Sequence, residues 1–282
     1  MLGLSRGQAP IMEHGQGNFA SEVLDFSSSA ESVRRALEGI SCAIHCAGHY
    51  EAGREELDEY VGSVEKLADA ADQCGLERLV LLSSVAVYGS DLQGWVGIDT
   101  TPTPDTPYAQ SRKRAEDVAK QRLSGSRTRL IIVRVPSVVG AEMRSRVLRR
   151  FFGSLRAGLF LHPGRKEALF ACVGIHRLAE CIARLADPED GEAPVMVQAV
   201  DCYRWVDLAN RFGSATGHVR PRIALPGPAV RFICRAVGYD IDRALKALDS
   251  TACYEDNSPQ LAASGVLPDS MDDIDALIAE AR

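Results

Sequence analysis

The fold is decided by an unbroken apolar run that ends in two serines, in the stretch Leu79-Val80-Leu81-Leu82-Ser83-Ser84-Val85-Ala86-Val87-Tyr88-Gly89. A short apolar run of this kind is typical of a strand that is buried on both faces, as in a parallel sheet covered by helices. Ser84 then stands at the carboxyl end of the strand, which is the edge at which ligands bind such sheets. We therefore predict a buried strand at Leu79–Leu82 with a functional serine after it.

Strand-like and helix-like patterns alternate on both sides of this run. Further strands are predicted at Leu2–Ser5, Glu22–Asp25, Ile40–Cys46 and Leu130–Val135. Helices are predicted at 28–39, with a capping box of Ser28 and Glu31, and at 57–75 and 108–123. This order predicts an α/β fold with a doubly wound parallel sheet. From about Met143 the pattern changes to that of a smaller mixed lobe.

The composition is that of an ordinary soluble globular protein. Of the 282 residues 46% are hydrophobic and 25% are charged, and the net charge is −6. No long run of one charge sign is present, which argues against nucleic-acid binding, and no apolar run reaches the ~18 residues of a membrane span. Met1–Pro10 carries no signal-peptide pattern, so we expect a cytoplasmic protein.

The eight cysteines are scattered through the sequence without a C-x-x-C pair. We expect buried free thiols in a reducing compartment. His45 lies close to Cys42 and Cys46, but this segment is predicted to be a buried strand, in which alternate side chains point to opposite faces. We therefore expect no metal site.

A second segment, Tyr108-Ala109-Gln110-Ser111-Arg112, follows Ser84 by 24 residues. It places Tyr108 and Arg112 at i and i+4, on one face of a predicted helix start. A tyrosine with a pKa of about 10 is a poor acid or base at neutral pH unless its phenolate is stabilised, and a cation one turn away can do that. Ser84, Tyr108 and Arg112 are therefore suited to moving a proton on or off a carbinol oxygen while a nicotinamide exchanges a hydride.

With these motifs the chain resembles the extended short-chain dehydrogenase/reductase superfamily, and within it the NAD-dependent epimerase/dehydratase family. The resemblance is carried by Ile44–Gly48, Ser83–Gly89, Tyr108–Arg112 and Arg134–Gly140, and in the substrate lobe by Gly158–Ile182 and Tyr254–Pro268. It implies a Rossmann-like dinucleotide-binding domain at 1–140, with its first strand missing, and an interleaved substrate-binding lobe at 141–282.

The resemblance also implies roles for particular residues. Ser84 would orient a substrate hydroxyl, Tyr108 would be the acid/base, and Arg112 takes the position of a lysine. The implied cofactor is NAD or NADP, bound by Arg6, Asp25, Phe26, Ala47, Gly48, Tyr108, Arg112, Pro136 and Val138. The substrate would contact Ser84, Val85, Tyr108 and Ser137. Arg6 favours NADP slightly, because an arginine after the second strand tends to accept the 2′-phosphate. Alternatively, Arg6 is a solvated loop residue and Asp25 a turn residue.

Four departures from the family pattern stand out. The family's opening strand and glycine-rich loop are not found in the sequence. Gly15–Ala20 matches the G-x-G-x-x-A spacing of the loop, but no strand is predicted before it, and a strand follows it where the family has a helix. Arg112 replaces lysine, Tyr60 replaces an active-site asparagine, and His176-Arg177 replaces an acidic pair. We expect the chain to start at the family's second strand. The strands at 2–5 and 22–25 would then either pair with 40–46 or leave an unpaired edge.

Two classes of function follow. The first is an NAD(P)-dependent epimerase, dehydratase or reductase that acts on a small molecule, a sugar nucleotide, with a steroid- or flavonol-type reductase as a further alternative. The second is a degenerate family member that binds a nucleotide or a partner protein without catalysis. The missing loop, Tyr60 and Arg112 favour the second class. A homodimer through the two long helices is common in the family.

Overall fold

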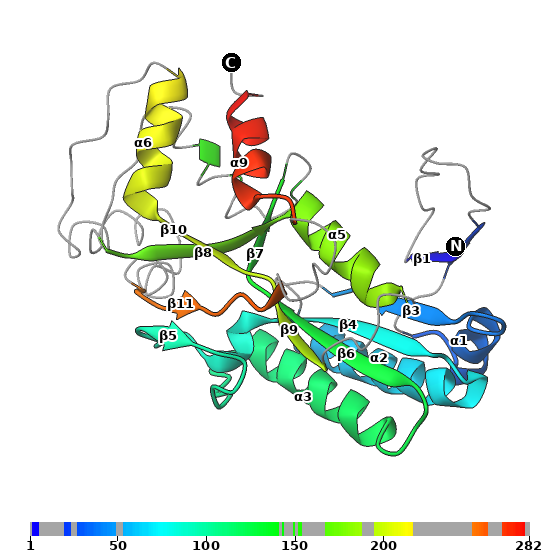
Figure 1. Cartoon of the computed structure of the whole chain (residues 1–282). Helices are drawn as coiled ribbons and strands as arrows, with labels where there is room; N and C mark the ends of the chain where they lie inside the picture. Colours follow the sequence, from blue (N-terminus) through cyan, green and yellow to red (C-terminus); the bar gives the residue numbers. More distant parts are fainter. Residues whose placement is uncertain are drawn as a thin grey trace. The chain divides into compact units, whose positions relative to one another are not determined.

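A computed structural model of the chain describes residues 2–5, 20–23, 27–48, 53–140, 143, 149, 152–153, 167–187, 195–216, 250–258 and 267–279 (Figure 1). The chain forms two compact units, and each is assembled from separate stretches of sequence. The first comprises Met1–Ser83, Thr106–Ile132 and Ala186–Val195. The second comprises Ser84–Asp105, Val133–Leu185 and Met196–Arg282.

The predicted buried strand is present as β4, Arg78–Ser84, in which Leu79, Val80 and Leu81 are at most 1% exposed. Its sheet has the order β3-β4-β6-β9, where β3 is Cys42–His45, β6 is Arg129–Val135 and β9 is Met196–Gln198. Strand β3 runs parallel to β4, with Cys42 opposite Arg78. The predicted α/β class with parallel strand pairing is thereby confirmed.

Three helices of the first unit follow the predicted order. They are α1 (Ala30–Ala36), α2 (Arg54–Cys74) and α3 (Pro107–Arg122), and α2 packs against both of the others (Figure 1). The apolar stripe predicted for α2 is buried, because it faces these neighbours; its members are Leu57, Val61, Val64, Leu67, Ala68 and Ala71. Helix α3 starts at an N-cap threonine, Thr106, whose hydroxyl accepts the Ala109 N–H at 3.1 Å.

The capping box predicted at Ser28 is wrong by one residue. The N-cap of α1 is Ser29, whose side chain accepts the Ser32 N–H at 3.1 Å. Glu31 does not reach back to the cap, because both of its oxygens bind Arg34, at 2.8 and 3.0 Å. Ser28 serves instead through its carbonyl, which accepts a hydrogen bond from Lys66 at 2.8 Å.

The strands nearest the start of the chain do not join the main sheet. Strands β1 (Leu2–Ser5) and β2 (Ala20–Val23) pair with each other in parallel and form a sheet of their own. In the part of the chain that the structure describes, β3 is therefore an edge strand. Of the two predicted alternatives, the unpaired edge is the one observed. The prediction that Cys42–Cys46 is a buried strand is wrong in its burial, because Ile44 is 43% exposed.

The second unit is built around a three-stranded sheet of order β10-β8-β7. Its strands are β7 (Ser137–Val139), β8 (Leu169–Gly174) and β10 (Asp201–Arg204), and a separate parallel pair is formed by β5 (Trp95–Val96) and β11 (Cys253–Tyr254). The helices are the short 3-10 helix η1 (Val85–Tyr88), α5 (Ile175–Ala186), α6 (Trp205–Thr216) and α9 (Ser270–Ala279). A core rich in aromatic residues joins β7, β8, α6 and α9, with Phe152, Phe170, Trp205 and Phe212 each at most 6% exposed.

The cysteines only partly follow the prediction of buried thiols. Among the seven that the structure describes all are free; Cys172 and Cys181 are buried, whereas Cys46 is exposed because it follows the edge strand β3. Among the helices described above, none combines the length and the apolar character needed to cross a bilayer.

Two glycines of α2 give a matched test of helix termination. Gly75 ends the helix in the left-handed region at φ +67°, and a Cβ there would meet no neighbouring atom. Gly75→Ala should therefore lower the free energy of unfolding by about 1 kcal/mol through backbone strain alone. Gly62→Ala, in the helix interior with equally open surroundings, should raise that free energy by up to about 1 kcal/mol. Urea unfolding checks both, and equal effects would contradict the prediction.

Candidate functional site

The first predicted site residue, Ser84, lies at the carboxyl end of β4 as expected and is 9% exposed. Its hydroxyl oxygen accepts the Ala86 N–H at 3.2 Å and so caps η1. A serine hydroxyl has one donor and two acceptor positions, so the hydrogen of Ser84 is still available to a ligand oxygen. Ser84 belongs to the second unit, whereas Tyr108 and Arg112 belong to the first.

Tyr108 lies in the first turn of α3, where Pro107 occupies the position that needs no N–H donor. The predicted shared helix face is confirmed, because the Arg112 guanidinium lies over the Tyr108 ring, 5.1 Å from its centroid. A cation on the face of an aromatic ring is attracted by the ring's quadrupole, and more strongly where water is excluded. The pair therefore provides a tyrosine with a fixed positive charge beside it.

Arg112 is 7% exposed, and its guanidinium is held from the protein side. One nitrogen, Nη1, donates to the Tyr60 hydroxyl at 2.6 Å and to the Leu82 carbonyl at 3.2 Å, with a longer contact of 3.5 Å to the Ala47 carbonyl. The guanidinium also stacks on the Tyr60 ring at 4.3 Å. Strands β3 and β4 and helices α2 and α3 thus all contribute to one cation site.

Tyr60 is the functional residue whose role sequence reasoning missed. It was noted as a departure from the family pattern, as was Arg112, but the structure shows that the two departures form one hydrogen-bonded pair. Tyr60 is 3% exposed, and burial raises the pKa of its hydroxyl above the ordinary value of 10, with Arg112 opposing part of that rise. The hydroxyl therefore stays protonated and neutral, and its oxygen accepts the hydrogen bond from Arg112.

Gly48 contacts the same guanidinium. Its φ is +133°, a conformation that favours glycine, and a Cβ added there would lie only 2.1 Å from Arg112 Nη2. Ala47 and Gly48, both predicted to bind the cofactor, are therefore brought together with Arg112 at the carboxyl end of β3. The predicted cofactor residues Arg6, Asp25 and Phe26 lie outside the described residues.

The remaining predicted residues lie in the second unit. Val85 begins η1 and is 8% exposed, and Ser137 and Val138 belong to β7, which Pro136 precedes. Below them Arg134 donates to the Tyr88 hydroxyl at 2.8 Å and lies over its ring at 4.8 Å. Tyr88 is fully buried, which agrees with its interpretation as a packing residue.

His45, the last residue of β3, is a second group that sequence reasoning did not place in the site. Its ring lies 5.7 Å from the Tyr60 ring, and its Nδ1 is buried with no hydrogen-bond partner among the described residues. Burial, and secondly the charge of Arg112, lower the pKa of His45 from 6.5 to about 4. His45 is thus neutral at pH 7, and Arg112 is the charged member of this group.

His176 and Arg177 start α5 and tie it to neighbouring segments. His176 Nδ1 lies 2.5 Å from Asp273, a carboxylate that also accepts the His176 backbone N–H at 3.2 Å. Arg177 binds Asp256 at 2.5 Å and the Pro268 carbonyl at 3.1 Å. Because these contacts join α5 to α9 and to the segment after β11, they support the structural interpretation of both residues.

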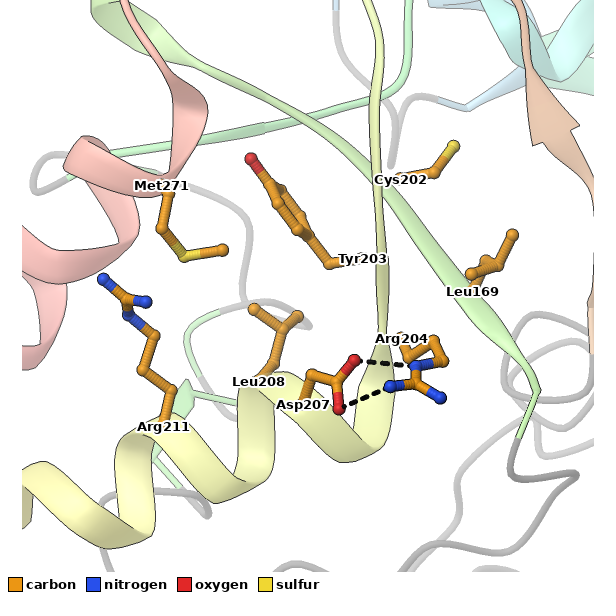
Figure 2. A pocket seen from close by; sticks show the side chains of 8 residues that line it. All are labelled: Leu169, Cys202, Tyr203, Arg204, Asp207, Leu208, Arg211 and Met271. Atoms are coloured by element: carbon orange, nitrogen blue, oxygen red, sulfur yellow. Dashed lines mark hydrogen bonds and ion pairs between the residues drawn. The ribbon is translucent and has the colours of Figure 1, made fainter.

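A separate hollow of about 320 Å³ lies in the second unit, between β8, β10, α6 and α9 (Figure 2). Its lining is Leu169, Cys202, Tyr203, Arg204, Asp207, Leu208, Arg211 and Met271. Both of its basic side chains are neutralised, Arg204 by Asp207 at 2.7 Å and Arg211 by Asp275 at 2.6 Å. None of the predicted site residues lines it.

Comparison with known proteins places this geometry in a family. Residues 12–174 match the model of the NAD dependent epimerase/dehydratase family. A curated relative, the uncharacterized protein y4nG of Sinorhizobium fredii, is 27% identical over 131 residues, which are 45% of this chain and 33% of that protein. The chain thus spans about a third of the length of the curated relative it matches.

Solved structures show the same fold at low sequence identity. UDP-N-acetylglucosamine 4-epimerase from Bacillus cereus matches with a TM-score of 0.72 and 14% identity, over 100% of this chain and 90% of that one. The Bordetella bronchiseptica enzyme WbmG in complex with NAD matches with a TM-score of 0.71 and 16% identity, over 99% and 84%. MoeE5, in complex with UDP-glucuronic acid and NAD, matches with a TM-score of 0.72 and 16% identity, over 99% and 89%.

The lowered pKa of His45 predicts a pH-dependent stability. The unfolded chain takes up a proton near pH 6.5, whereas the folded chain resists it down to about pH 4. Stability from the neutral ring is therefore complete above pH 6.5 and is lost as the pH falls toward 4, by about 3 kcal/mol in total. His45→Phe, which keeps a ring without a titrating nitrogen, should flatten the urea midpoint across this window. The same slope in both proteins would contradict the assignment.

Proposed function

The chain belongs to the NAD dependent epimerase/dehydratase family, and on that premise we propose that it is an NAD(P)-dependent epimerase, dehydratase or reductase whose substrate is a sugar nucleotide. The observation that carries the proposal is the Arg112 cation over the ring of Tyr108. The substrate class is supported by the UDP-sugars in the complexes of MoeE5, a protein of the same fold.

In the proposed reaction Tyr108 accepts the proton of a sugar hydroxyl, and the Ser84 hydroxyl donates a hydrogen bond to the same substrate oxygen. Tyr108 acts as the phenolate, which becomes a neutral phenol as it takes the proton, and Arg112 at the Tyr108 ring supplies the positive charge beside that phenolate. Bound NAD or NADP would supply the hydride acceptor. An epimerase returns the hydride and proton to the same sugar, whereas a reductase runs the transfer once in the opposite direction.

The residues of the turn after β3 fit a dinucleotide. Gly48 has no side chain to obstruct an approaching ligand, and the guanidinium beside it supplies N–H donors for phosphate or ribose oxygens. We assign Ala47, Gly48, Tyr108 and Arg112 to cofactor binding in the first unit and Pro136 and Val138 in the second. Val85 and Ser137 are assigned to the substrate, with 1–140 as the cofactor domain and 141–282 as the substrate lobe.

A second candidate function is a non-catalytic nucleotide-binding or protein-interaction module. It is favoured by the bonds of Arg112, because Nη1 already donates to Tyr60 and to the Leu82 carbonyl. Nη1 is therefore not available to a cofactor, which leaves only the N–H groups of Nη2 and Nε. Catalysis and cofactor binding must therefore be measured separately.

The catalytic role of Tyr108 is tested by Tyr108→Phe. Removal of the phenolic hydroxyl should lower turnover at least about 100-fold, which is the size of a general acid–base contribution, while the ring and its contact with Arg112 remain. Product analysis with a panel of UDP-sugars measures turnover, and circular dichroism checks the fold. Tyr254→Phe, a change in the second unit outside the proposed site, should retain full activity. Full activity of Tyr108→Phe would refute the assignment.

Cofactor titration tests whether the chain can be an enzyme of this family or acts without a cofactor. Calorimetry with NAD, NADH and NADP should give a dissociation constant of about micromolar size for at least one of them if the chain is an enzyme of this family. Arg6→Ala should weaken the binding of NADP and leave that of NAD unchanged, because only NADP carries the 2′-phosphate. Absence of binding by all three would exclude the proposed enzyme and leave the module.

A further inference from the structure

The two nitrogens at the end of the Arg112 fork face different surroundings. Nη1 donates to the Tyr60 hydroxyl at 2.6 Å and to the Leu82 carbonyl at 3.2 Å. Nη2 lies over Gly48, where a Cβ would come within 2.1 Å of it, and no hydrogen bond joins Nη2 to the described part of the chain. One branch of the fork is thus anchored in the protein, and the other has N–H groups to donate.

The anchor matters because an arginine side chain has many rotamers. Fixing such a side chain in one rotamer costs conformational entropy, and a guanidinium that is not held in place would bear this cost each time a ligand bound. The Tyr60 hydroxyl, together with ring stacking at 4.3 Å, holds the group before a ligand arrives. Tyr60 can do this without competing charge, because burial keeps its hydroxyl protonated.

We propose that Tyr60 is the positioning residue of this site: its hydroxyl fixes one branch of the Arg112 guanidinium so that the other branch stays over Gly48 as a donor to an oxygen of the bound ligand. The proposal rests on the proposed function for the identity of that ligand, a nicotinamide dinucleotide. Tyr60 itself is not catalytic, because it acts through Arg112.

A binding cycle tests the proposal on the full chain with NADH as the probe. Tyr60→Phe keeps the ring and removes the hydroxyl, and it should weaken NADH binding about tenfold, the size of a lost hydrogen bond to a charged group. Arg112→Met removes the fork and should weaken binding further. In the Arg112→Met background, Tyr60→Phe should change the affinity less than about twofold, because Tyr60 then has nothing to position. A purely structural tyrosine would weaken binding by the same factor in both backgrounds.

Tyr203→Phe is the matched control. It also removes a tyrosine hydroxyl that donates to a side chain, Asp269 at 3.0 Å, but it lies in the second unit. This variant should bind NADH with native affinity. Circular dichroism checks each variant, and Arg112→Leu, which also removes every donor, replaces Arg112→Met as the background if the latter does not give the native spectrum.

Three results would overturn the proposal or separate it from the proposed function. Native NADH affinity in Tyr60→Phe, or an equal loss in both backgrounds, overturns the positioning role. If the unaltered chain binds neither NADH nor NADPH, the proposed function fails. The contact between Tyr60 and Arg112 is then measured by urea unfolding of the unaltered chain, the two single variants and the double variant. If Tyr60 anchors Arg112, the unfolding equilibrium constant of the double variant should differ about tenfold from the value expected if the two single substitutions acted independently. Independent effects of the two substitutions would overturn the positioning role of Tyr60 as well.

Discussion

The Arg112 guanidinium is 7% exposed and touches residues from β3, α2, β4 and α3. Removing a cation from water costs several kcal/mol unless its donors are satisfied, so each surrounding group is constrained by the charge. The Leu82 and Ala47 carbonyls point their oxygens at it, and Gly48 leaves room for it. The local geometry of the proposed site therefore depends on how this one charge is accommodated.

Burial keeps the two titratable neighbours of Arg112 uncharged, and the charge of Arg112 reinforces that effect at His45 and opposes it at Tyr60. The pKa of His45 falls to about 4, and burial raises that of Tyr60, so both groups are uncharged at neutral pH. Arg112 is therefore the positively charged member of this group, and the buried Glu116 also acts on Tyr60. A guanidinium with N–H groups left to donate favours ligands that carry phosphate or other polar oxygens. This agrees with a dinucleotide cofactor better than with an apolar ligand.

Features that depend on short-range sequence were predictable. The apolar run of β4, the end of α2 at Gly75 and the shared face of Tyr108 and Arg112 all follow from neighbouring residues and are present in the structure. The N-cap of α1 is one residue later than predicted: Glu31 favours Ser28 in the run Ser27–Ser29, but Glu31 binds Arg34 and the cap is Ser29.

Features that depend on packing were not predictable. Tyr60 and Arg112 are 52 residues apart, and their bond exists only because α2 packs against α3. The burial of His45 Nδ1 and the separate pairing of β1 with β2 are likewise decided by tertiary contacts. No local pattern at Tyr60 distinguishes a cation's partner from an ordinary core tyrosine.

The close approach of Gly48 to Arg112 has an evolutionary consequence. A methyl group at position 48 would occupy the space of the guanidinium, so substitutions at the two positions are epistatic: the effect of one depends on which residue is present at the other. A larger side chain at position 48 would therefore require the Arg112 guanidinium to move, although the two residues are 64 positions apart in the chain.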